Sequence, residues 1–183
     1  VEVVPVDAAR HAADLYAAPT GPGTETSWTY LSVGPWSDRA SLDAWLAQAE
    51  RSEDPFTYAL VDKASGKALG IATYMRIEPA HRVIEVGGIW YTPALQRTRA
   101  ATEAMYLMAK NAFEVLRYRR YEWKCNAFNE PSRRAAQRLG FTYEGLFRQH
   151  MIARGRNRDT AWFSMLDGEW PARRQAFERW LPP

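Results

Sequence analysis

Residues 96–104 (QRTRAATEA) combine two arginines with the start of a predicted helix. The N-terminus of a helix presents unpaired backbone N–H groups and a partial positive charge, so it favours a phosphate or pyrophosphate group. Arg97 and Arg99 add the charge that such a ligand needs, because a guanidinium binds phosphate through two parallel hydrogen bonds. The segment therefore predicts a phosphate-binding loop at the start of a long helix.

A second group of residues with suitable chemistry follows later in the chain. Asn129 and Ser132 flank Pro131, and residues 139–141 read Leu-Gly-Phe. Proline suits the first turn of a helix, and Gly140 can end that helix in a left-handed turn. The pattern predicts the end of a strand, a short capped helix and a glycine stop.

Glu85 is the carboxylate whose surroundings favour acid–base chemistry. It lies within residues 83–89 (VIEVGGI), which otherwise read as an apolar strand. A carboxylate in such a strand is either a proton acceptor or half of a structural ion pair, with Arg82 or another sheet residue as its partner. The sequence leaves both interpretations open.

Alternation of apolar residues, turn residues and helical spacing predict the elements that position these groups. Trp170 and Pro171 open a terminal helix. The other helices are expected over residues 8–17, from 38 to about 51, through 101–115, and in a short segment ending near 139. Strands are expected over residues 1–6, 56–61, 69–77, 83–91, 121–125, 143–152 and 160–166.

The order and spacing of these pieces resemble the GNAT acetyltransferases, in particular their RimJ/RimL-like (ribosomal-protein-type) branch. The resemblance runs from Val1 to about Trp170 and rests on Gln96, the Ala-Thr-Glu-Ala run at 101–104, Asn129, Ser132, Leu139-Gly140-Phe141 and Trp170-Pro171. It implies a single α/β (α+β) domain over residues 1–183, with a mixed, mostly antiparallel sheet flanked by helices. It also implies transfer of an acetyl group from acetyl-CoA to a primary amine, by direct attack in a ternary complex.

The resemblance assigns roles to individual residues. Glu85 is expected to act as the base, and Ser132 is the family-type candidate for the acid; the alternative for Ser132 is a helix cap or a contact with the pantetheine arm. Contacts with acetyl-CoA are implied for Ile89, Trp90, Tyr91, Gln96, Arg97, Thr98, Arg99, Ala100, Ala101, Thr102, Asn126, Asn129 and Ser132. Asn126 could equally close a turn.

Two positions depart from the family pattern. Arg97 and Arg99 stand where the motif usually has glycines, whose backbone can approach phosphate closely. We interpret both arginines as phosphate contacts; the competing interpretation is a loop that has lost its ligand. Ala136 stands where many GNAT members carry a tyrosine as general acid, which leaves Ser132 as the nearest candidate.

The acceptor site is expected near an aromatic segment over residues 18–36. Trp28, Tyr30 and Trp36 could line it and bind a peptide N-terminus or a small-molecule amine. The tryptophans could equally belong to the core or to a contact between two copies of the chain.

Composition excludes several other classes of protein. The net charge is only +3, so the arginine clusters favour a solvated surface over a nucleic-acid interface. No apolar run could span a membrane, and with three histidines and one cysteine we expect no metal site. Cys125 is interpreted as buried and structural; the alternative is the nucleophile of a covalent acyl-enzyme. A chain with a single cysteine fits the cytoplasm.

The sequence leaves open three alternatives to an enzyme that acetylates peptide N-termini. The acceptor could be a small-molecule amine, or the chain could be a CoA-binding module of the same fold without turnover. It could also be a basic nucleic-acid-associated protein, whose binding would fall steeply with salt.

Overall fold

The computed structural model describes residues 1–17 and 25–181. The chain divides into two compact units, each built from two segments. Unit 1 comprises Val1–Arg76 and Gly87–Met108, and unit 2 comprises Ile77–Val86 and Ala109–Pro183. Residues that are far apart in sequence therefore meet within each unit.

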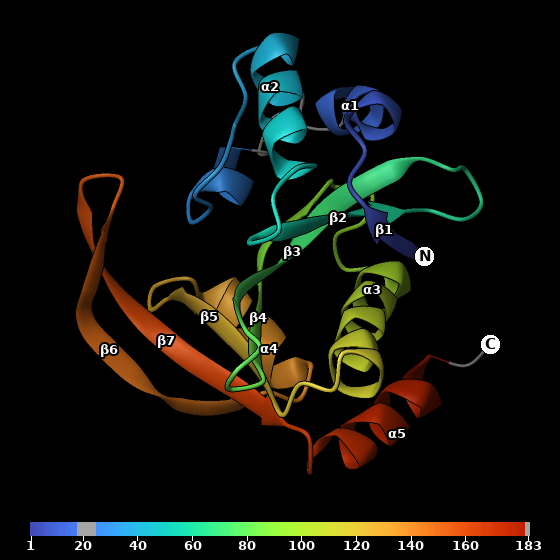
Figure 1. Cartoon of the computed structure of the whole chain (residues 1–183). Coiled ribbons are helices and arrows are strands. Elements are labelled where there is room, and N and C mark those ends of the chain that lie inside the picture. Colours follow the sequence, from blue (N-terminus) through green and yellow to red (C-terminus); the bar gives the residue numbers. More distant parts are fainter. Residues whose placement is uncertain (18–24, 182–183) are drawn as a thin grey trace. The chain divides into compact units, whose positions relative to one another are not determined.

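Seven strands form one mixed sheet in the order β1-β2-β3-β4-β5-β7-β6 (Figure 1). Of the pairs with a described register, β4–β5 is parallel, and β1–β2, β2–β3, β5–β7 and β6–β7 are antiparallel. This is the mixed, mostly antiparallel sheet that was predicted. The strands are β1 (Glu2–Pro5), β2 (Phe56–Val61), β3 (Ala68–Glu78), β4 (Val83–Tyr91), β5 (Arg120–Asn126), β6 (Thr142–Ala153) and β7 (Arg156–Leu166).

Unit 1 buries two helices against each other and against its strands. Helices α1 (Ala8–Ala17) and α2 (Arg39–Ala49) lie side by side (Figure 1), and Leu15, Leu42 and Leu46 are fully buried between the layers. A capping box starts α2, because the Asp38 carboxylate accepts from the backbone N–H of Ser41. The unit also contains a short 3-10 helix (Glu25–Trp28) and most of α3 (Arg99–Lys110).

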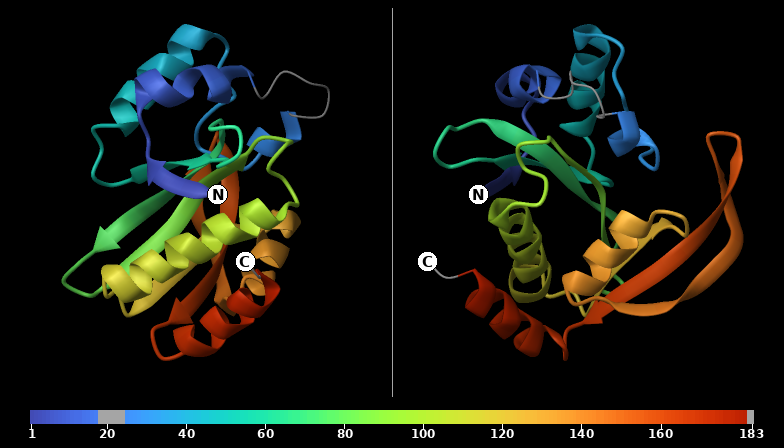
Figure 2. Two further views of the ribbon diagram at one scale, coloured as in Figure 1. Left: turned by 90° about the vertical axis from the view of Figure 1, so that its right-hand side faces the viewer. Right: turned by 180° about the vertical axis from the view of Figure 1, so that it is seen from behind.

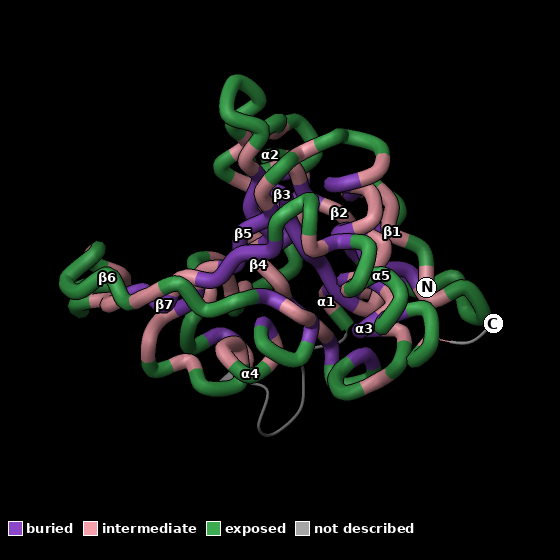
Figure 3. Tube along the Cα trace, turned by 90° about the horizontal axis from the view of Figure 1, so that it is seen from below, coloured by how far each residue is buried: buried purple, intermediate pink, exposed green. Residues whose placement is uncertain are grey.

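Unit 2 contains β5, the helices α4 (Glu130–Arg138) and α5 (Trp170–Trp180), and a long hairpin. Helix α4 contacts β5 and β6, while α5 begins with Trp170 stacked on Phe113 of the π-helical segment Asn111–Val115. Strands β6 and β7 form the hairpin (Figure 2). Most of β6 is exposed, whereas the C-terminal half of β7 is mostly buried (Figure 3).

Every predicted helix and strand is present, and the differences lie at the ends. Strands were expected over residues 143–152 and 160–166, but β6 continues to Ala153 and β7 already begins at Arg156, so the turn between them is shorter than predicted. Pro131 occupies the second position of α4, after Glu130. Gly140 follows α4 with φ of +92°, as the predicted left-handed stop requires. Residues 18–24 of the expected aromatic segment lie outside the described residues.

Candidate active site

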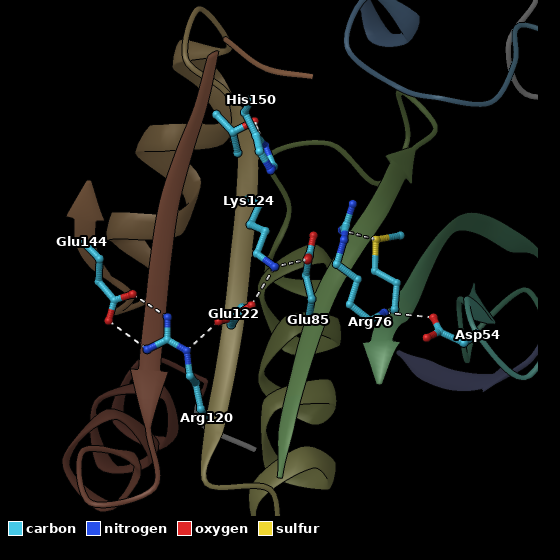
Figure 4. Close-up of polar contacts among 10 residues, drawn as sticks. Asp54, Arg76, Glu85, Arg120, Glu122, Lys124, Glu144 and His150 are labelled. Atoms are coloured by element: carbon cyan, nitrogen blue, oxygen red, sulfur yellow. Dashed lines mark hydrogen bonds and ion pairs between the residues drawn. The ribbon is translucent and has the colours of Figure 1, made fainter. Parts of the chain in front are cut away.

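Glu85 lies on β4 with only 3% of its surface exposed. Its Oε2 atom is 2.9 Å from the Nζ atom of Lys124 on the parallel strand β5 (Figure 4). The ion-pair interpretation is therefore correct, but the partner is Lys124; the guanidinium of Arg82 instead donates to the backbone oxygen of Arg117. An ion pair and a base are compatible roles, so the base role stays a prediction.

The Glu85–Lys124 pair is one end of a row of alternating charges in unit 2. Lys124 also lies 2.7 Å from Glu122, whose other oxygen accepts from Arg120. Arg120 in turn donates to both oxygens of Glu144 on β6 (Figure 4). The hydroxyl of Ser164 donates to the same carboxylate. The row runs across the sheet from β4 to β6.

The neighbours of these carboxylates change their proton affinity. Burial alone would raise the pKa of Glu122, but the hydrogen bonds and charges of Lys124 and Arg120 outweigh it and lower the pKa below the ordinary value. The hydrogen bonds from Arg120 lower the pKa of Glu144, and burial opposes them only in part. Both groups are therefore ionised at neutral pH.

Aromatic rings lie beside the charged row: Phe147 and His150 on β6 are exposed, and Trp162 on β7 is half-buried. The Nζ atom of Lys124 is 3.9 Å from the centre of the Trp162 ring, a cation–π contact. Phe147 packs on the same ring at 4.4 Å between centroids, and His150 lies 5.9 Å from it. The Nδ1 atom of His150 is 2.9 Å from the hydroxyl of Thr160.

A bulge in β6 brings His150 to this face. An unbroken strand would place Phe147 and His150 on opposite faces, because their numbers differ by three. However, β6 advances four residues from Phe147 to Met151 while β7 advances only two. Gln149 takes a φ of +49° in the bulge, and its N–H donates to the carboxylate of Asp159. Bulges of this kind redirect side chains beside functional sites.

Sequence reasoning did not connect Lys124, Trp162 or His150 with the charged row that includes Glu85. A signal for Lys124 was available, since charged residues at 120, 122 and 124 alternate with apolar residues at 121, 123 and 125. Such alternation places the three charges on one face of a strand. No comparable signal marks His150, because its position depends on the bulge.

The loop before α3 is held by side chains that were predicted to contact acetyl-CoA. The amide of Gln96 donates to the backbone oxygen of Tyr91, at the end of β4. The hydroxyl of Thr98 donates to the backbone oxygen of Leu95 and accepts from the N–H of Ala101, so Thr98 caps α3. These bonds shape the loop; direct contact of Gln96, Thr98 and Ala101 with acetyl-CoA stays a prediction.

Arg97 adopts a conformation that is rare for any residue except glycine. Its φ is +60°, in the left-handed region, at a position where the motif usually has glycine. The arginine therefore keeps the backbone shape of a glycine loop and adds an exposed side chain. Arg99 opens α3 and is also exposed, followed by half-buried Ala100 and, one turn in, buried Thr102.

The end of β4 belongs to unit 1 and is anchored by its core. Trp90 is 3% exposed and stacks on Trp28 at 4.7 Å between centroids, while Ile89 and Tyr91 are half-buried. Gly88 before them has φ of +56°. A backbone contact of Ile89, Trp90 and Tyr91 with the pantetheine arm stays a prediction.

The tryptophans predicted to line the acceptor site belong mainly to this core. Trp28 is 3% exposed, and Trp36 meets its ring edge-on at 5.1 Å and also packs against Trp45. Of the two interpretations of these tryptophans, membership of the core therefore applies to Trp28 and Trp36 in unit 1. Tyr30, at 39%, is the exposed member of the predicted set.

Asn126, Asn129 and Ser132 lie together in unit 2, where β5 leads into α4. The side-chain oxygen of Asn126 accepts from the N–H of Phe128 and closes a turn, the alternative that the sequence had left open. Asn129 caps α4 by accepting from the N–H of Ser132, and the Ser132 hydroxyl accepts from the indole N–H of Trp123. Ser132 is thus not itself the cap.

Cys125 is buried beside Ser132, as expected for a structural cysteine. Burial raises the pKa of its thiol, and a hydrogen bond with Ser132 offsets this only in part. Within residues 1–17 and 25–181, no group of three or more His, Cys, Asp or Glu side chains is arranged to hold a metal ion. Among the described helices, none combines the length and hydropathy needed to cross a bilayer.

A family model described as "Acetyltransferase (GNAT) domain" matches residues 2–142. The curated protein "Putative ribosomal N-acetyltransferase YdaF" from Bacillus subtilis (strain 168) is 28% identical over 105 residues. That match covers 57% of this chain and 57% of the relative, so the chain spans little more than half of the length of that protein.

Solved structures resemble the chain over a greater length. A GCN5-related N-acetyltransferase from Brucella melitensis is 51% identical, with a TM-score of 0.95 over 99% of this chain and 82% of the other. A probable acetyltransferase of the GNAT family from Chromobacterium violaceum ATCC 12472 is 45% identical, with a TM-score of 0.85 over 92% of this chain and 84% of the other. These matches confirm the predicted fold.

Proposed function

Because the chain belongs to the GNAT acetyltransferase family, we propose that it transfers the acetyl group of acetyl-CoA to a primary amine by direct attack. The observation that carries the choice of mechanism is the buried carboxylate of Glu85, held by Lys124 on the neighbouring strand. A buried carboxylate that a neighbouring side chain holds in one orientation can accept a proton from an attacking amine.

The proposed reaction has one bond-forming and one bond-breaking event. The amine nitrogen attacks the carbonyl carbon of the thioester, the C–N bond forms, and the C–S bond breaks to release the thiolate of CoA. The proton leaves the amine for Glu85, directly or through a water molecule. The thiolate needs little assistance, because a thiol has an ordinary pKa of about 8.5.

The loop at the start of α3 supports the assignment of acetyl-CoA as the acyl donor. The backbone of Arg97 keeps the left-handed turn that a glycine would adopt, and Thr98 caps the helix that follows. The first N–H groups of such a helix, together with the exposed side chains of Arg97 and Arg99, would hold the pyrophosphate. These features support a loop that binds acetyl-CoA over one that has lost its ligand.

The acceptor is proposed to be a peptide N-terminus or a small-molecule amine. The name of the Bacillus subtilis relative refers to a ribosomal substrate, which favours peptides with the N-terminal sequences of ribosomal proteins as the first acceptors to test. Simple aliphatic amines provide the small-molecule class.

Thermal unfolding with and without acetyl-CoA tests the donor site. Binding at about 100 times the dissociation constant adds roughly 2.7 kcal/mol, a rise of about 5–10 °C in Tm for a chain of this size. Thiol release with each acceptor then tests turnover. A rise in Tm with thiol release for one acceptor class supports the proposal and identifies the class.

Two other outcomes would contradict the proposal. A rise in Tm without thiol release from any amine would favour a CoA-binding module without turnover. No rise at millimolar acetyl-CoA would mean that the loop before α3 does not bind this ligand.

A further inference from the structure

Lys124 occupies the point where two buried carboxylates meet. Its Nζ atom is 2.9 Å from Oε2 of Glu85 and 2.7 Å from Oε2 of Glu122 (Figure 4). The side chain of Lys124 is only 6% exposed, and the ring of Trp162 lies against its ammonium. Water therefore has little access to the charges of this group.

The sheet register explains why the three groups converge. Glu85 on β4 and Glu122 on β5 are direct partners in a parallel pair, so their side chains lie next to each other on one face. Lys124 is two residues further along β5 and points to the same face. One ammonium thus serves two carboxylates that would otherwise repel each other.

We propose that Lys124 is a positioning residue for Glu85, and that Glu122 limits this effect by competing for the same ammonium. This inference rests on the proposed function, in which Glu85 accepts the proton of the amine. A buried carboxylate stays ionised only if an opposite charge compensates for the loss of water, and a second carboxylate nearby acts in the opposite sense. The positive charge of Lys124 and the negative charge of Glu122 therefore act on the Glu85 carboxylate in opposite senses.

Other charged groups of unit 2 face the same region and must be included. Arg120 on β5 binds Glu122 and Glu144, and so takes up part of the negative charge of Glu122. His150 on β6 contacts the ring of Trp162, on which the Lys124 ammonium also lies. Because the side chain of His150 is ionisable, its contribution to a pH profile needs a separate control.

The test is the pH dependence of kcat/KM for acetyl transfer in a set of single variants. Activity falls on the acidic side when the base becomes protonated. In Lys124→Met this acidic limb should move to higher pH by about one unit or more, because an opposite charge at this distance is lost. In Glu122→Gln the limb should move to lower pH, because Lys124 then serves Glu85 alone. Lys124→Arg should restore most of the wild-type profile.

His150→Gln is the matched control, and its acidic limb should coincide with that of the wild type. Lys124→Met leaves two buried carboxylates without their ammonium and could fail to fold. In that case Glu122→Gln decides, since it removes a charge and keeps the shape of the side chain. An acidic limb that stays in place in Glu122→Gln, or that moves in the same direction in both variants, overturns the inference.

Glu85→Gln separates this inference from the proposed function. If that variant keeps the wild-type acidic limb, Glu85 is not the base, and both the mechanism and the role of Lys124 are wrong. If Glu85→Gln loses the limb but neither Lys124→Met nor Glu122→Gln moves it, the mechanism stands and only the inference about Lys124 fails.

Discussion

The guanidinium of Arg120 on β5 donates to both carboxylate oxygens of Glu144 on β6, although β7 lies between these two strands. Ser164 on β7 fills the gap between them and donates to the same carboxylate at 2.7 Å. The pair therefore ties three strands together on the face that carries Glu85. Arg120 is half-buried and Glu144 is exposed, with side chains 24% and 38% exposed.

The Arg120–Glu144 pair should contribute more to stability than an ordinary surface pair. A double-mutant cycle with Arg120→Gln and Glu144→Gln should give a coupling of about 1 kcal/mol, measured by urea unfolding at pH 7. The control is the exposed Arg39–Asp43 pair on α2, at 2.7 Å, for which about 0.3–0.5 kcal/mol is expected. Equal couplings would mean that the bidentate geometry adds nothing.

The same pair predicts a loss of stability in acid. The pKa of Glu144 is lowered by Arg120, so the native state binds fewer protons on this group than the unfolded state does. Its stabilisation is complete above the ordinary glutamate pKa of about 4.3 and disappears as the pH falls through the lower native value. Urea unfolding of the wild type and of Glu144→Gln should therefore converge as the pH falls, and parallel curves would contradict the assignment.

Arg97 should affect acetyl-CoA binding and stability through separate features. Arg97→Gly should stabilise the fold by about 0.5–1 kcal/mol, because the left-handed φ of +60° no longer carries a Cβ atom. Arg97→Ala keeps that backbone cost. Both variants should bind CoA about ten-fold more weakly, since one charge-assisted hydrogen bond is lost.

A CoA fragment without phosphates provides the control for Arg97. Calorimetric titration should show that both variants bind the fragment as the wild type does. Equal losses for CoA and for the fragment would mean that Arg97 acts through the shape of the loop and not through phosphate.

Glu85→Gln should lower kcat by about 10²–10⁴-fold, the range of a general base, with little change in the affinity for acetyl-CoA. The matched control is Glu130→Gln, which removes an exposed carboxylate of α4 that pairs with Arg133 and Arg134. Steady-state kinetics across a pH series separate the two variants. A rate for Glu85→Gln that equals the wild-type rate at every pH would remove Glu85 from the mechanism.

Gly34 should be more sensitive to substitution than Gly66, although both have left-handed backbones with φ of +61° and +70°. A Cβ atom at Gly34 would lie 2.5 Å from the ring of Trp28, whereas a Cβ atom at Gly66 would meet nothing within 4 Å. Gly66→Ala should destabilise by about 1 kcal/mol through the backbone alone. Gly34→Ala should add about 1–3 kcal/mol of overpacking, measured by thermal unfolding.

The sequence was sufficient to predict the helices and strands and to identify single residues, such as Glu85, with unusual surroundings. Helical spacing, alternation and turn residues depend on neighbours in the chain, so the strands, helices and the stop at Gly140 followed from local pattern. Glu85 stood out for the same reason, as a carboxylate within an apolar strand. The alternation at 120–125 also indicates one charged face of β5, but it does not reveal which residues that face contacts.

The arrangement of the site depended on contacts between residues that are distant in sequence. Lys124 meets Glu85 only because β4 and β5 pair in a particular register, and Arg120 reaches Glu144 only because β7 inserts between their strands. A bulge, which local sequence does not reveal, turns His150 to the face of Trp162.

The sequence by itself therefore determined which elements form and which residues can carry charge or accept a proton. Only the tertiary structure decided the partner of Glu85, the left-handed backbone of Arg97 and the burial of Trp28. The physical reason is that propensity and periodicity act over a few residues, whereas register, bulges and burial are set by the packing of distant segments.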